Sequence, residues 1–150
     1  MNKRIAMTLL SVLVGYSTIA NCEEWPSGSA MYSGSLAVHE KVYFQEKSDN
    51  ILEKIYTKIP EEYQEDVIKK QVQALRNYAD SACLIVGMSS GAGGSWPSTY
   101  SVRCEAGIAF QHYKSLKNSL KCIERVEEQS YIFPGEKLNC VIQSLNTKFF

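Results

Sequence analysis

The stretch that decides the fold is Cys83-Leu-Ile-Val-Gly-Met-Ser-Ser-Gly-Ala-Gly-Gly-Ser-Trp-Pro-Ser-Thr-Tyr-Ser-Val-Arg-Cys104. One long segment with periodic apolar residues runs into Cys83, and another runs out of Cys104. A glycine-rich connection between two such segments predicts two antiparallel helices joined by a loop. If the two sulfur atoms pair, they close a loop of 22 residues. In the loop-entropy model this contributes about 3–3.5 kcal/mol to stability.

The segment before Cys83 carries the first apolar row. Its members recur at spacings of four and three residues, which predicts a helix with one buried face: Ile68, Val72, Leu75, Ala79, Ala82 and Val86. Pro60 can open this helix, with Glu61 and Glu62 in its first turn. The glycines from Gly87 to Gly91 end it. Polar residues off the row are expected in solvent: Lys69, Lys70, Gln73, Arg76, Asn77 and Asp80.

The segment after the loop carries the matching row. Its members step by four and three residues in the same way: Val102, Ala106, Ala109, Tyr113, Leu116, Leu120 and Ile123. Lys114, Lys117 and Lys121 fall on the outer side, and the helix is expected to fray near residues 127–129. Two such rows should pack antiparallel at the shallow crossing angle of helical bundles.

Shorter elements flank this hairpin. Ser48 can cap a helix that Pro60 ends, with Leu52, Ile55 and Ile59 on one face. A last short helix is predicted over residues 136–146. Residues 21–47 are interpreted as an N-terminal arm, irregular to residue 35 and then either a short helix or extended. The predicted fold is therefore all-α, a small disulfide-stapled antiparallel helical bundle over residues 48–150.

The N-terminus has the pattern of a secretory signal peptide over residues 1–20. A short basic region at Lys3 and Arg4 precedes an apolar run, and Thr18 and Ala20 supply small residues at a cleavage site. Without the signal, 14 basic residues face 16 acidic ones, a net charge of −2. This charge does not suggest a nucleic-acid partner or a polybasic membrane patch.

Five cysteines remain after cleavage, which in an exported protein indicate a disulfide framework. Cys122 and Cys140 are the natural second pair, since they would pin the last helix to the end of the long one. Cys22 is left over. Residues 19–22 partly resemble a lipoprotein signal in which Cys22 would carry a lipid, but Asn21 is larger than the residue usual there. The sequence therefore favours a soluble periplasmic protein over a lipid anchor.

The residues that could form a phosphate-binding, metal-binding or acid/base site lack the sequence pattern that each kind of site requires. The glycine-rich loop lacks a preceding strand and a Gly-Lys-Ser/Thr run, so it does not indicate phosphate binding. His39 and His112 have no partner at metal-ligand spacing, and His112 is expected at the helix surface or edge. Glu61-Glu62 and Glu127-Glu128 are adjacent pairs at helix ends, where neighbours do not face each other. We predict no catalytic residue, metal or cofactor, and hence no enzyme.

The loop itself is the candidate for binding a partner. Ser95, Trp96 and Tyr100 lie between the two cysteines. A stapled loop loses less conformational entropy on binding, and Trp and Tyr are favoured anchors at interfaces. The alternative is that Trp96 packs down onto the helix pair and closes the core.

Several motifs resemble the domain of the LprI-type lysozyme inhibitors. They are Asp49-x-x-Leu52-x-x-x-Tyr56, then Gln73-Ala74, Tyr78, Asp80 and Cys83, then Gly93-Gly94-Ser95, then Cys104. The likeness covers about residues 48–120. Leu75 stands where that family usually has Trp, and Ala79 where it has Arg. The resemblance implies a helical, disulfide-stapled envelope protein that in some family members inhibits lysozyme, and the departures are compatible with another target.

These observations lead to one functional hypothesis and its alternatives. The hypothesis is a periplasmic, non-enzymatic inhibitor or immunity protein that binds a peptidoglycan-acting enzyme, such as lysozyme or a secreted cell-wall toxin. The alternatives are an envelope enzyme or ligand-binding helical protein that uses the bundle core, or a structural protein without an enzyme target. The apolar rows contain no buried ionisable group, which favours the inhibitor.

Overall fold

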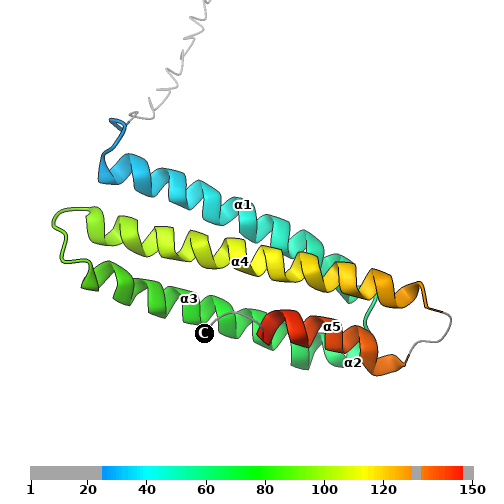
Figure 1. The fold of residues 1–150 in the computed structure, drawn as a ribbon. Helices are drawn as coiled ribbons and strands as arrows, with labels where there is room; N and C mark the ends of the chain where they lie inside the picture. Colours follow the sequence, from blue (N-terminus) through cyan, green and yellow to red (C-terminus); the bar gives the residue numbers. More distant parts are fainter. Residues whose placement is uncertain (1–24, 130–132, 147–150) are drawn as a thin grey trace, which may run out of the picture.

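The computed structural model describes residues 25–129 and 133–146. The predicted signal peptide (1–20) and Cys22 lie outside these residues. The regular elements of the described residues are all helices, with no strand among them (Figure 1). Its elements in chain order are α1 (Ala30–Tyr56), α2 (Glu61–Tyr63), the π-helical segment η1 (Gln64–Lys69), α3 (Lys70–Ser89), α4 (Trp96–Glu127) and α5 (Pro134–Asn146).

Helix α4 is the centre of the molecule. Helices α1 and α3 pack on either side of it, and α5 packs on its C-terminal half (Figure 1). Helix α3 runs antiparallel to α4, as predicted, and the Cys83–Cys104 disulfide joins them with 5.4 Å between the Cα atoms. A second disulfide, Cys122–Cys140, joins α4 to α5. The predicted disulfide-stapled antiparallel bundle is therefore confirmed.

Helix α1 begins within the predicted N-terminal arm: residues 30–35, predicted to be irregular, are helical, and of the two alternatives for residues 36–47 the helix is the one that forms. Residues 30–47 are helical and continue without a break into the segment expected to begin at Ser48. The cap is Ser29, whose hydroxyl accepts a hydrogen bond from the Tyr32 amide at 3.1 Å. Ser48 instead lies buried inside the helix and donates to the Phe44 carbonyl at 2.8 Å.

The reason for this error lies in how α1 packs. It packs mainly against α4, and few of its residues are buried. Before Ser48 its one buried apolar residue is Ala37, while Leu36, Val38 and Val42 are exposed. An apolar row that is mostly exposed does not produce the helical period on which the prediction relied.

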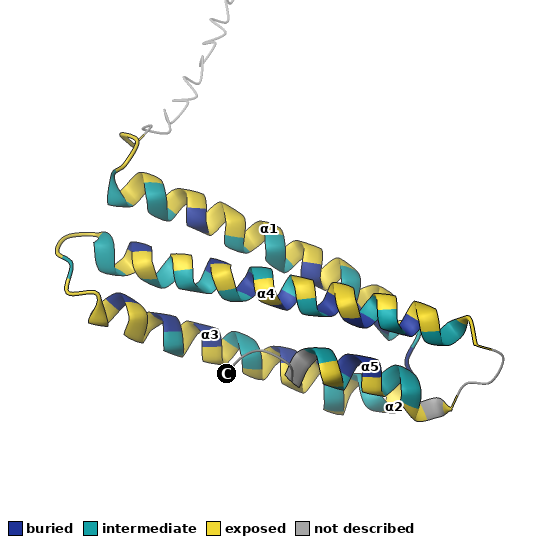
Figure 2. Ribbon diagram, viewed as in Figure 1, coloured by how far each residue is buried: buried dark blue, intermediate teal, exposed yellow. Residues whose placement is uncertain are grey.

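The main core lies at the end of the molecule where α5 adds a fourth helix. Members of both predicted rows contribute to it, and α5 supplies Val141 (Figure 2). The buried cluster contains Leu52, Ile55, Ile59, Ile68, Val72, Leu116, Ile123, Cys140 and Val141. The lysines predicted on the outer side of α4 are exposed, and Lys114 and Lys117 lie over the rings of Phe110 and Tyr113.

At the opposite end, α1, α3 and α4 form a thinner layer. Its buried residues are small: Ala37, Ala79, Cys83, Gly87, Thr99, Ala106 and Ala109. The predicted row of α3 does not hold to its end, because Val86 is exposed while Cys83 and Gly87 face α4. A Cβ atom at Gly87 would stand 2.4 Å from the Pro97 carbonyl oxygen. The disulfide and this close approach together fix which side of α3 meets α4.

The connection between α3 and α4 uses glycine where the backbone requires it. Gly91 and Gly94 have φ values of 65° and 63°, the left-handed region that other residues rarely adopt.

Among residues 25–129 and 133–146, no helix is both long and apolar enough to cross a membrane.

Candidate functional site

The predicted binding residues lie at the start of α4 and not in a loop. Trp96 and Tyr100 occupy its first two turns, with ring centroids 5.8 Å apart. Trp96 is half-buried and Tyr100 is 37% exposed. Ser95 sits at the N-cap position, where its side chain makes no cap and its carbonyl accepts from the Ser98 hydroxyl at 2.8 Å. Trp96 and Tyr100 thus form an aromatic pair on a regular helix.

The end of α3, which precedes this pair in the chain, also exposes large apolar side chains that were not selected from the sequence. Met88 is 74% exposed and Ile85 is 66% exposed, and Leu84 is also exposed. The signal was present as the run Leu84-Ile85-Val86, which is wider than one buried stripe of a helix can absorb. We call Leu84, Ile85, Met88, Trp96 and Tyr100 together the apolar tip.

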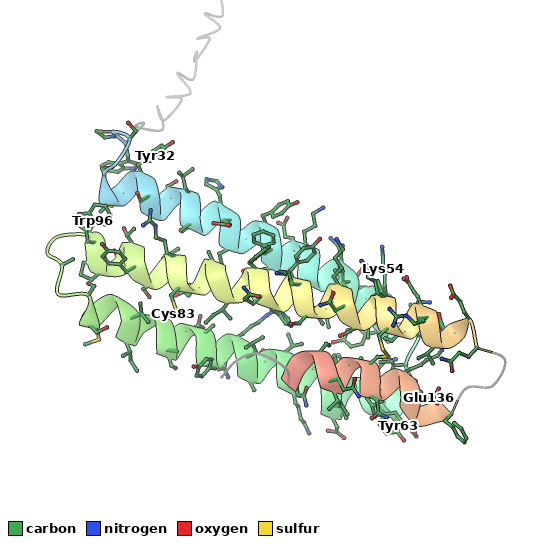
Figure 3. All side chains as sticks on the ribbon, viewed as in Figure 1. Tyr32, Lys54, Tyr63, Cys83, Trp96 and Glu136 are labelled. Atoms are coloured by element: carbon green, nitrogen blue, oxygen red, sulfur yellow. A yellow bond between two sulfur atoms is a disulfide. The ribbon has the colours of Figure 1, made fainter. Side chains whose placement is uncertain are left out.

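Three contacts hold the apolar tip in place. Gly87 lies against Pro97, and the Cys83–Cys104 disulfide joins the same two helices nearby. The Thr99 hydroxyl donates to the Ala30 carbonyl at 2.8 Å, which ties the start of α1 to the start of α4. Figure 3 shows Trp96 at this end of the molecule, where α1 begins. The tip therefore presents its side chains from a fixed backbone.

A second feature is a groove bounded by α1, α3 and α4, with a volume of about 350 Å³. Polar side chains from all three helices line it, including Lys41 and Gln45 of α1, Arg76, Asn77 and Asp80 of α3, and Glu105 and His112 of α4. We call it the polar groove. Lys41 pairs with Glu105 at 2.5 Å. Arg76 reaches from α3 to Asp49 of α1 at 2.6 Å.

His112 lies in the wall of the polar groove, and its position corrects the prediction of a surface residue. It is 5% exposed, and its Nε2 atom is buried without a hydrogen-bond partner. Burial and the nearby Arg76 charge lower the pKa of His112 to about 4, so its ring is neutral at pH 7. An unsatisfied buried polar atom costs about 1–3 kcal/mol. The apolar rows therefore do surround a buried ionisable group, contrary to the expectation.

The sequence contained a signal for this burial. Ala109, His112, Leu116, Ser119 and Ile123 step by three and four residues, and all five are buried. The predicted row used Tyr113 and Leu120, which are half-buried at the edge of this stripe. Because the observed stripe includes a histidine and a serine, a search for apolar residues alone replaced these two members by their apolar neighbours, Tyr113 and Leu120.

Glu127, predicted as a charge at a helix end, forms ion pairs with two lysines from other segments. Its carboxylate accepts from Lys58 at 2.5 Å and from Lys137 at 2.7 Å, which links the segment after α1 and helix α5 to α4. These hydrogen bonds lower the pKa of Glu127.

His39 is exposed on α1. Within the described ranges, no three His, Cys, Asp or Glu side chains are grouped so that they could hold a metal ion.

Comparison with protein-family models, with curated proteins and with solved structures finds no match for this chain. The resemblance to the LprI-type inhibitors therefore stays a prediction. The two disulfides indicate an oxidising, extracytoplasmic environment.

Proposed function

We propose that this protein is a periplasmic inhibitor or immunity protein that binds and blocks a peptidoglycan-acting enzyme through its apolar tip. The observation that carries the proposal is the exposure of Ile85 and Met88 on a backbone fixed by a disulfide. Large exposed apolar side chains grouped at one end of a protein often mark an interaction site.

The composition of the tip fits a protein partner. Trp96 and Tyr100 are residue types that dominate binding energy at interfaces, and Met88 is a side chain that adapts to irregular surfaces. Because the backbone is already ordered, binding would cost mainly the conformational entropy of side chains. A narrow, stapled helical end can enter the substrate cleft of a hydrolase and exclude the glycan.

The resemblance to LprI-type inhibitors and the predicted signal peptide point to the same compartment and class of partner. Inhibition in this way needs no catalytic group in the inhibitor. It needs a surface that stays ordered outside the cell membrane, and a disulfide next to that surface supplies such order.

The test is a titration of peptidoglycan hydrolysis. Lysozyme and a panel of secreted cell-wall toxins would each be mixed with the mature, oxidised protein, and again after reduction and alkylation. We expect stoichiometric inhibition of one enzyme and its loss on reduction. If no enzyme of either class is inhibited at large excess, the proposal is wrong.

The tip is tested separately with surface variants. We expect Ile85→Asp with Met88→Asp, and Trp96→Ala with Tyr100→Ala, each to weaken inhibition by about tenfold or more. The matched control is Val42→Asp, because Val42 is an exposed apolar residue on α1 outside the tip. Circular dichroism would show that each variant is folded. Unchanged inhibition by the folded tip variants would move the interface to another surface.

A further inference from the structure

We infer that the polar groove is a binding site for a small zwitterion of the amino acid or short peptide class. This inference goes beyond the proposed function and uses a different surface. It rests on three observations: a cavity of about 350 Å³, a buried histidine in its wall without a hydrogen-bond partner, and charges of both signs around it.

His112 is buried in the wall of the groove. Its neighbours on the buried stripe of α4 include Ala109 and Leu116, and an apolar residue at position 112 would fill the same site without an unpaired nitrogen. A neutral imidazole offers one donor and one acceptor. His112 lines the groove, so a ligand whose polar group reached the ring would pair with Nε2 and remove this unfavourable state.

The groove is lined by two cations, Lys41 and Arg76, and by two carboxylates, Asp80 and Glu105. A polyanion such as a phosphorylated ligand would meet both carboxylates, and a simple cation would meet Lys41 and Arg76. Lys41 is paired with Glu105 and Arg76 with Asp49, whereas Asp80 makes no ion pair among the described residues. A zwitterion can therefore place its ammonium group near Asp80 and its carboxylate beside the two cations.

The cations are already held at the groove by acidic partners. Glu105 positions Lys41, and Asp49 positions Arg76. Such fixed side chains lose little further conformational freedom when a ligand arrives. Gln45 and Asn77 add amide groups that suit a peptide bond, while Leu75 and Ile108 give apolar contact for a short side chain.

The size of the cavity sets the limit on the ligand. A volume near 350 Å³ is at the lower end of the range for small-molecule sites. It suits an amino acid or a dipeptide better than a folded partner's helix. In the compartment proposed above, amino acids and short peptides would include those released from peptidoglycan.

The experiment is an isothermal titration of the folded, oxidised protein with the dipeptide Ala-Ala. N-acetylglucosamine serves as the uncharged control and inorganic phosphate as the anionic one. We expect saturable binding of Ala-Ala alone. In parallel, nitrogen NMR of the two histidine rings should show a shift for His112 and none for His39, with a His39→Gln variant providing the assignment.

Two variants test the assigned contacts. Asp80→Asn and Arg76→Gln remove one charge each, and we expect Ala-Ala binding to weaken roughly ten- to hundredfold in both. Asp66→Asn is the matched control, because Asp66, in the adjoining segment η1, pairs with Lys70 of α3 outside the groove. Asp80 and Asp66 are exposed, so neither change should disturb folding.

Three results would overturn the inference. Absence of saturable Ala-Ala binding would mean that the groove holds only water. Equal binding of N-acetylglucosamine or phosphate would contradict the zwitterion class. Binding that Asp80→Asn and Arg76→Gln leave unchanged would place the ligand elsewhere. Since the Ile85 and Met88 variants leave the groove intact, they should still bind Ala-Ala even if they no longer inhibit a hydrolase.

Discussion

The two ends of this molecule are built differently. At the α5 end, four helical segments enclose Ile55, Ile68, Leu116 and Ile123, all fully buried. At the tip end, three helices enclose mainly alanines and the Cys83–Cys104 disulfide, and large apolar residues point to solvent. Each end has one disulfide, but the α5 end also buries large apolar side chains, whereas the tip adds close backbone contact between α3 and α4. This arrangement leaves the tip's apolar side chains free to bind.

The sharpest test of this difference replaces isoleucine at each end. We expect Ile123→Ala to lower the free energy of unfolding by about 2–5 kcal/mol, because it opens a cavity in the packed core. Ile85→Ala should change it by less than about 0.5 kcal/mol, since that side chain is mostly exposed. Urea denaturation of both variants gives the comparison. Similar losses would show that the tip also has a packed core.

The boundary between the two ends contains His112, and it should make stability depend on pH. In the folded protein the pKa of His112 is about 4, below the ordinary value of 6.5. The unfolded chain therefore binds a proton first as the pH falls below about 6.5. Stability is highest above that pH and decreases toward pH 4, by about 3 kcal/mol from this group.

Several charged groups surround this histidine, so the test must isolate it. Arg76 and Asp49 act on its charge, and Asp80, Glu105 and Lys41 share the groove. Denaturation midpoints of the parent and of His112→Gln would be compared from pH 4 to pH 8. We expect the variant to have a flatter profile over that range. Parallel profiles would show that His112 does not carry the dependence.

At the tip end, backbone contact replaces side-chain burial, and Gly87 tests it. An added methyl group would lie 2.4 Å from the Pro97 carbonyl oxygen, so α3 and α4 must move apart. We expect Gly87→Ala to cost about 1–3 kcal/mol. The control is Gly93→Ala in the adjoining loop, where a Cβ atom would meet nothing within 4 Å. Thermal melts that gave equal losses for both would contradict this contact.

The same contrast explains which elements could be predicted from the sequence. The helices that meet in the main core have clear apolar rows, and the hairpin and both disulfides followed from them. The part of helix α1 before Ser48 was not predicted, because Leu36, Val38 and Val42 lie in solvent and leave no buried row there. An apolar period reports burial, so it fails where a helix packs through small residues.

The candidate sites were predicted less well than the fold. Trp96 and Tyr100 were selected by residue type, but the glycines before them suggested a longer loop than the one that forms. The exposure of Ile85 and Met88 was not predicted, because apolar residues at the end of a predicted helix are ordinarily assigned to a core. His112 was missed because the predicted row admitted apolar residues alone, although its spacing from Ala109 and Leu116 on α4 indicates burial.

The smallest expected effect belongs to the α5 end. Glu127 receives hydrogen bonds from Lys58 and Lys137, which connect helix α5 and the segment after α1 to α4. All three side chains are partly exposed, so the pairs are screened by solvent. We expect Glu127→Gln to lower stability by less than about 1 kcal/mol, because burial of Val141 and the Cys122–Cys140 disulfide still hold α5 in place. Urea denaturation at low and high salt would measure it, with Glu124→Gln on the exposed face of α4 as the control. A loss as large as that of Ile123→Ala would mean that ion pairs, and not burial, attach α5.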